Sequence, residues 1–278
     1  MLAAVVVAGC TLPRPAGEGI VRYRDQVFSS VDVTRDVVYG SADVQGQPVD
    51  LKLDLYQPSG DTVAHRPLLI WVHGGGFTGG DKTSGATQAN FFARRGYVAA
   101  SINYRLLSPT GCGGTPSPTL ICEQAAIAAQ HDAQAAVRWF RANASTYRID
   151  TGRIAMAGSS AGAVTSLLVD WRSEDPGNSG NPGYPSAIRA AVSLSGGAPT
   201  NEAIDASDPP AIFFHGDQDR TVPFEWAVRN AAAMYEATIF TVLQVLEGVG
   251  HGLGWTNQIQ EQSDYFLYYA MGLGNAEG

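Results

Sequence analysis

A serine stands between small residues at the junction of an apolar run and a helix-like segment. Residues 154–157 favour a buried strand, and the Gly-Ser-Ser-Ala-Gly sequence at 158–162 fits the pattern G-x-S-x-G. In that pattern the central residue, here Ser160, lies on a sharp strand-to-helix turn that exposes its hydroxyl, and Ser159 takes the variable position. Glycines at either side leave room for neighbouring elements to approach closely. These features predict that Ser160 is a nucleophile.

A serine hydroxyl is a weak nucleophile unless a base accepts its proton, and histidine is a common base. His251 lies between Gly250 and Gly252, which suits a side chain carried on a loop that reaches across the edge of a sheet. We therefore expect His251 to be the base. The remaining histidines are expected to be solvated or structural: His65, His73, His131 and His215.

The base in turn needs a carboxylate that orients its ring. The segment His-Gly-Asp-Gln-Asp-Arg-Thr-Val-Pro at 215–223 offers Asp217 and Asp219. Asp217 lies inside a tight turn, where a carboxylate usually caps its own backbone. We therefore select Asp219 as the third catalytic residue. The alternative for Asp219 is an ion pair with its neighbour Arg220.

A glycine-rich segment, His-Gly-Gly-Gly-Phe at 73–77, follows a predicted strand. The backbone N–H groups of Gly75 and Gly76, with that of Ala161, are predicted to form an oxyanion hole that stabilises a tetrahedral intermediate. Such a loop could instead hold a phosphate, but no G-K-[ST] follows at the required spacing. The chemistry implied by these residues needs no metal ion and no cofactor.

The rest of the chain must bring these four segments together. Alternating apolar and polar residues predict two antiparallel strands at 33–39 and 49–56, and more continuous apolar runs predict buried strands. The other predicted strands are 67–72, 98–104, 153–157, 187–194, 211–214 and 238–246, and the predicted helices are 132–143, 163–169, 224–236 and 255–271. This alternation predicts a mostly parallel sheet with helices on both faces. Each of the four segments follows a predicted strand, so all four should lie at one edge of the sheet.

From about residue 32 to residue 272 the sequence resembles α/β-hydrolase esterases, in particular bacterial carboxylesterases of the feruloyl-esterase-like and hormone-sensitive-lipase-like groups. The resemblance rests on HGGGF (73–77), NYRL (103–106), HDAQAAVRWFRANASTYRID (131–150), RIAMAGSSAGA (153–163), HGDQDRTVP (215–223) and GHG (250–252). The order Ser, Asp, His along the chain is also that of α/β-hydrolases. Ser159 stands where many relatives carry Asp, which fits the feruloyl-esterase-like group better. The resemblance implies an α/β-hydrolase fold with a mostly parallel central sheet of about eight strands and a minimal lid.

The segments expected to cover the site, 107–122 and 170–186, are short and rich in Gly, Pro and Ser. Neither contains an amphipathic helix long enough to cover an acyl chain, which predicts an open, shallow site for short-chain, aryl or polymer-linked esters. The candidate walls are Phe77, Trp171 and Trp226, although such aromatic residues also occur in cores. Two alternatives stay open: a serine peptidase of the same fold and a non-enzymatic binding module on a hydrolase scaffold.

The first residues of the chain are apolar and end in Val-Ala-Gly-Cys, which resembles the lipobox of bacterial lipoproteins with Cys10 as the lipidated residue. No Lys or Arg precedes the apolar run, and the alternative is a frayed hydrophobic tail. We expect residues 1–25 to be a signal remnant and tether, and residues 26–278 to form a single catalytic domain. An exported protein of this kind would be periplasmic, attached to the outer membrane or secreted.

The remaining cysteines, Cys112 and Cys122, flank a loop rich in Gly and Pro. Export would favour a disulfide between them, and the alternative is two free thiols. The net charge is −8 and the basic residues are scattered, which argues against nucleic acid as a partner. The expected partners are a small-molecule or polymer-linked ester and, through a lipidated Cys10, a membrane. The oligomeric state is left open.

Overall fold

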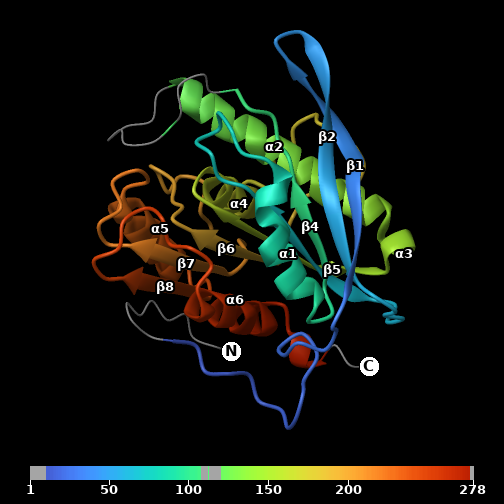
Figure 1. Cartoon of the computed structure of the whole chain (residues 1–278). Helices are drawn as coiled ribbons and strands as arrows, with labels where there is room; N and C mark the ends of the chain where they lie inside the picture. The colour runs from blue at the N-terminus through green and yellow to red at the C-terminus, as the bar shows by residue number, and fades with distance from the viewer. Residues whose placement is uncertain (1–10, 108–111, 113–119, 276–278) are drawn as a thin grey trace.

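The computed structural model describes residues 11–107, 112 and 120–275, and within these ranges eight strands form one sheet (Figure 1). Their order is β1-β2-β4-β3-β5-β6-β7-β8. Pairing is antiparallel for β1 with β2 and for β2 with β4, and parallel from β4 through β8. The strands are β1 Val31–Val44, β2 Gln47–Pro58, β3 Arg66–Val72, β4 Val98–Ile102, β5 Ile149–Ser159, β6 Ala190–Leu194, β7 Ala211–Gly216 and β8 Thr241–Leu246. The predicted mostly parallel α/β-hydrolase sheet is confirmed.

Helices cover both faces of the sheet, as the alternating pattern predicts. They are α1 Ala86–Ala93, α2 Leu120–Ala142, α3 Ala144–Tyr147, α4 Ala161–Trp171, α5 Phe224–Glu236 and α6 Asn257–Ala270, with short 3-10 turns at Lys82–Gly85 and Leu273–Asn275. One core cluster joins α2, α4 and α5 to the sheet, and a second joins α1 and α6 to its other face (Figure 1). The sheet is therefore buried between two helical layers.

Two helices differ from the sequence-based expectation. Helix α2 begins at Leu120 rather than at residue 132. The alanine-rich segment before residue 132 favours helix, so the helix extends back to the Gly- and Pro-rich loop flanked by Cys112 and Cys122. Helix α1 was not predicted, since its short sequence has weak helical periodicity; it is held by Phe92, which is fully buried against the sheet. Strands β3, β4, β6 and β7 are buried along their whole length, as their continuous apolar runs predict.

The described part of the expected N-terminal tether packs against the fold. The backbone N–H of Leu12 donates a 2.5 Å hydrogen bond to Gln262 Oε1 on α6. Arg24 is buried and donates to the carbonyl oxygens of Pro15, Gly17 and Gly19, which gathers the segment around one guanidinium group. Residues 11–25 therefore belong structurally to the domain, whereas Cys10 lies outside the described residues. Of the helices in the described ranges, none is long and apolar enough to span a bilayer.

Close packing between α4 and the sheet depends on two glycines. A Cβ atom on Gly158 would lie 2.3 Å from the carbonyl oxygen of Gly162, and a Cβ on Gly162 would lie 2.1 Å from that of Val72. Real Cβ atoms do not approach backbone oxygens so closely. The glycines of the G-x-S-x-G pattern are thus required for the first turn of α4 to sit against the end of β3.

We predict that Gly162→Ala lowers the free energy of unfolding by about 1–3 kcal/mol, because the added methyl group must push α4 away from β3. Urea denaturation measures this change. Gly252→Ala is the matched control, since a Cβ at that position meets no atom within 4 Å. Equal stability of the two variants would show that α4 tolerates the displacement.

Candidate active site

Ser160 occupies the turn between β5 and α4 with a backbone conformation of φ 55° and ψ −122°. Residues other than glycine rarely adopt positive φ, and such strain persists only where surrounding contacts enforce it. Here the Ser160 N–H donates to Leu194 O at 2.8 Å, and the Ser160 carbonyl accepts from Val164 N at 3.0 Å. These bonds hold the turn between β6 and the first turn of α4. The hydroxyl is therefore presented at the carboxyl edge of the sheet.

The structure brings Ser160, Asp219 and His251 together, although they are far apart in the sequence. Ser160 Oγ lies 2.8 Å from His251 Nε2, and His251 Nδ1 lies 2.8 Å from Asp219 Oδ2. An Nδ1–H that donates to the carboxylate leaves Nε2 free to accept the serine proton. Asp219 is buried, and its Oδ1 accepts from the backbone N–H groups of Thr221 and Val222 at 2.8 and 3.1 Å. The geometry is that of a serine–histidine–aspartate triad.

The loop that carries His251 is fixed at two points. Ser195 Oγ, after β6, donates to the backbone carbonyl of His251 at 2.8 Å. Asp217 Oδ1 accepts from the backbone N–H of Gly248 at 2.7 Å. The sequence predicts that Asp217 caps its own turn. In the structure this hydrogen bond joins the loop after β7 to the loop after β8, because these two parallel strands are neighbours. The imidazole is thus positioned by loops from three adjacent strands.

A second histidine contacts the triad aspartate. His215 is fully buried at the end of β7, and its Nε2 lies 3.1 Å from Asp219 Oδ2 and 3.0 Å from Val222 O. Both neighbours are acceptors, so Nε2 must carry a proton that they share. Burial lowers the pKa of the His215 imidazole and favours its neutral form. The sequence indicated a structural role for His215 but not the contact with Asp219.

The glycine-rich segment after β3 lies beside Ser160. Gly75, Gly76 and Ala161 all line the same cavity as the serine, which is where the sequence-based oxyanion-hole prediction requires them. Gly75 has φ +125°, and a Cβ on it would lie 2.1 Å from Gly79 O, so the loop needs glycine here. His73 anchors the loop: its Nδ1 lies 2.7 Å from Gly74 O, and burial lowers the pKa of its imidazole.

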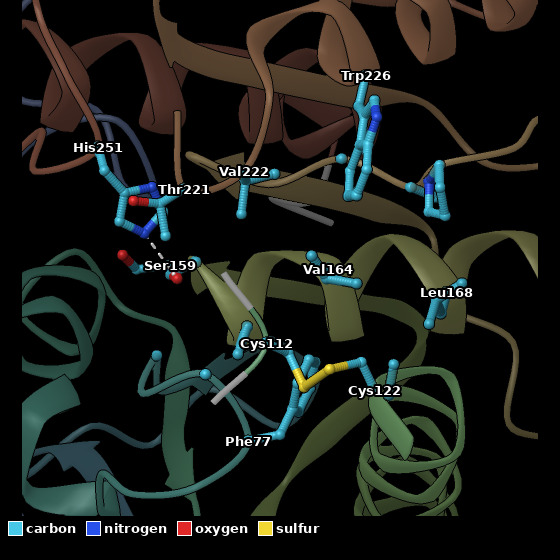
Figure 2. A pocket seen from close by; sticks show the side chains of 18 of the residues that line it. Phe77, Cys112, Cys122, Ser159, Val164, Leu168, Thr221, Val222, Trp226 and His251 are labelled. Carbon is cyan, nitrogen blue, oxygen red and sulfur yellow. Dashed lines mark hydrogen bonds between the residues drawn. A yellow bond between two sulfur atoms is a disulfide. The ribbon is translucent and has the colours of Figure 1, made fainter. Parts of the chain in front are cut away.

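The site opens into a cavity of about 810 Å³, which is larger than the shallow site expected from the sequence (Figure 2). Phe77 and Trp226 line this cavity, as predicted. Trp171 does not: helix α4 continues through residue 171, and the Trp171 ring is only 5% exposed within the core. The assignment of Trp171 as a substrate wall is therefore corrected to a core residue.

The two segments expected to cover the site have different roles. Residues 173–186 pack mainly against α2, where Arg138 Nη1 donates to Pro176 O at 2.7 Å and Ser179 Oγ donates to Asp132 Oδ1 at 2.6 Å. Most of the other segment lies outside the described residues. Its two cysteines are joined in a disulfide with Cα atoms 5.5 Å apart, and both line the cavity (Figure 2). The disulfide thus belongs to the wall of the site.

Several cavity residues were missed by sequence reasoning. They include Ile127, Val164, Leu168, Arg172 and Val222. Val164 and Leu168 follow Ser160 at intervals of four in the sequence, which places them on one face of α4, and Arg172 comes directly after the helix. That spacing was available as a signal, because residues in line with the nucleophile along a helix share its exposed side. Within the described ranges, no cluster of three or more His, Cys, Asp or Glu side chains could hold a metal ion.

The fold defines the class of the protein as an α/β-hydrolase. The family model described as BD-FAE matches residues 53–196, about half of the chain, and the chain belongs to this family. The match contains the glycine-rich segment and Ser160. Asp219 and His251 lie beyond the matched residues, so their placement in the site rests on the structure.

Curated relatives are esterases and lipases that match only part of their own length. The chain is 29% identical over 157 residues to esterase LipI of Mycobacterium tuberculosis, which covers 56% of this chain and 44% of that protein. It is 27% identical over 161 residues to lipase 4 of Diutina rugosa, covering 56% of this chain and 28% of that protein. The chain therefore spans less than half the length of these two relatives.

Solved structures match over almost the whole fold. Esterase 2 of Thermogutta terrifontis with propionate bound has a TM-score of 0.68 at 26% identity, covering 88% of this chain and 94% of that chain. The same esterase has also been solved with butyrate bound and phosphorylated by paraoxon. Together the comparisons support a carboxylic ester hydrolase.

We predict that His215→Phe lowers kcat for ester hydrolysis about tenfold, because Asp219 loses one buried hydrogen bond and orients His251 less well. Steady-state kinetics on p-nitrophenyl acetate measures the change. His65→Phe, at an exposed position outside the cavity, is the control and should behave as the parent protein. An unchanged kcat in His215→Phe would leave this histidine with a packing role only.

Proposed function

We propose that this protein is a serine carboxylesterase that hydrolyses short-chain or aryl carboxylic esters, including esters linked to a polymer. The observation that carries the proposal is the pair of 2.8 Å contacts that connect Ser160 to His251 and His251 to Asp219. A buried carboxylate, an imidazole and a hydroxyl in this order can activate an oxygen nucleophile at neutral pH.

In the proposed first step, Ser160 Oγ attacks the ester carbonyl carbon while His251 Nε2 accepts the hydroxyl proton. The carbonyl oxygen becomes an oxyanion that the N–H groups of Gly75, Gly76 and Ala161 stabilise; one such donor typically contributes about 3 kcal/mol to the transition state. The intermediate collapses to an acyl-enzyme, and the alcohol leaves with the proton from His251. Water then attacks the acyl group by the same route, which releases the acid and restores Ser160.

The relatives support an ester as the substrate and a small acyl group as one that fits. Propionate and butyrate are bound in structures of the Thermogutta terrifontis esterase. Paraoxon phosphorylates that esterase, and organophosphates react with activated serine hydroxyls. The cavity volume of about 810 Å³ exceeds the needs of an acetyl group and leaves room for an aryl or polymer-linked ester.

We predict that Ser160→Ala lowers kcat for p-nitrophenyl acetate by at least about a thousandfold, because no nucleophile remains. Ser159→Ala is the matched control, since it removes the neighbouring hydroxyl and should keep most of the activity. A fluorophosphonate probe should label the parent protein and Ser159→Ala but not Ser160→Ala. Undiminished turnover by Ser160→Ala would refute the assignment of the nucleophile.

Assays on the parent protein and these two variants also distinguish the alternative functions. A serine peptidase would cleave peptide anilides faster than p-nitrophenyl acetate, whereas the proposed esterase should show the reverse. A binding module on a hydrolase scaffold would fail to react with the fluorophosphonate. The intact triad geometry favours the esterase over the binding module, because such modules generally lack a triad member.

We further infer that the protein is exported and attached to a membrane through a lipidated Cys10. The Cys112–Cys122 disulfide supports an oxidising compartment. Cys10→Ser should therefore move the protein from the membrane fraction to the soluble fraction of bacterial cells. A protein that is soluble before the substitution, or stays on the membrane after it, would contradict lipidation at this residue.

A further inference from the structure

Helix α4 presents one narrow row of side chains to the cavity. Within α4, every residue is buried except Val164 and Leu168, and both line the cavity (Figure 2). They follow Ser160 by one and two turns, and Arg172, directly after the end of α4, also lines the cavity. Since α4 begins at the nucleophile, this row starts at the reacting oxygen and leads away from it.

Apolar groups from other elements face this row. Val222 and Trp226 lie on one side, from the loop after β7 and from α5 (Figure 2). Phe77 and the Cys112–Cys122 disulfide lie on the other side of α4 in the same view. Val164 and Leu168 thus form the floor of an apolar groove, which we call the α4 groove.

The apolar part of the α4 groove has a defined length. Leu168 lies eight positions after Ser160, which at the rise of an α-helix corresponds to about 12 Å. Beyond Leu168 the wall becomes ionic: Arg172 Nη2 lies 3.1 Å from Asp175 Oδ2. Methylene groups that extend past this point would lie against an ion pair and gain little from leaving water.

The position of His251 indicates which part of an ester lies in the groove. The leaving oxygen must take its proton from His251 Nε2, so the alcohol lies on the His251 side of Ser160. Val164 and Leu168 extend away from His251 (Figure 2). The acyl chain therefore has the groove available, whereas the alcohol does not.

We propose that the α4 groove is an acyl subsite that takes unbranched chains up to about the length of octanoate, with Leu168 as the residue that measures chain length. This inference rests on the proposed esterase function and extends it from short to medium acyl chains. Burial of added methylene groups should raise kcat/KM at least about tenfold from butyrate to octanoate. No further rise is expected for dodecanoate, whose end would reach Arg172 and Asp175.

Two isomeric esters, ethyl octanoate and octyl acetate, test the subsite because they exchange the acyl and alcohol positions of the long chain. We expect Leu168→Trp, which fills the groove, to lower the kcat/KM ratio of ethyl octanoate to octyl acetate at least about tenfold. Leu168→Asn, of similar size but polar, should lower the same ratio without added bulk. The control is Val228→Trp, an exposed residue on α5 outside the cavity, which should leave the ratio unchanged.

Because both esters are measured on the same preparation, misfolded protein cancels from the ratio, and titration with a small fluorophosphonate shows that each variant keeps a reactive Ser160. The proposal would be overturned if both Leu168 variants left the ratio of ethyl octanoate to octyl acetate unchanged. It would also be overturned if the variants lowered kcat/KM for octyl acetate alone. A parent protein that prefers ethyl acetate to ethyl octanoate would overturn it as well. Failure of the esterase function itself would be visible separately, as a parent protein that the fluorophosphonate does not label.

Discussion

The hydrogen bond between Ser160 Oγ and His251 Nε2, 2.8 Å long, is the interaction on which the site depends. It joins the turn after β5 to the loop after β8, and in the sheet β6 and β7 lie between these strands. A parallel sheet makes the contact attainable, because its strands all end at the same edge. The glycines around Ser160 let α4 approach β3 closely, which keeps the serine at that edge in a conformation it would otherwise avoid.

The intervening strands contribute the groups that hold the imidazole in place. Ser195, after β6, binds the backbone of His251, and Asp217, after β7, binds the backbone of Gly248. His215 contacts Asp219 with a buried imidazole whose pKa is lowered by burial. These contacts connect the ends of β6, β7 and β8, which are consecutive strands of the sheet. A small displacement of β7 would therefore disturb the acid, its support and the loop of the base together.

Helix α4 links reactivity to substrate choice. Its first turn fixes Ser160, and its exposed row of Val164 and Leu168 forms the floor of the cavity. The other residues of the same helix are buried, and Trp171 at its end belongs to the core. One rigid element thus holds the nucleophile and the proposed acyl subsite at a constant separation, which loops could not maintain as accurately.

The sequence by itself determined the class of fold, and it singled out Ser160, Asp219 and His251, which the structure places in contact. Alternating strand and helix patterns, G-x-S-x-G and the glycine-flanked His251 are local signals, and they depend only on neighbouring residues. Only the tertiary structure decided that Trp171 belongs to the core, that residues 11–25 pack on the domain and that His215 contacts Asp219. Those outcomes depend on which face of a helix meets the sheet and on which strands are neighbours. Both are long-range properties that local periodicity does not encode.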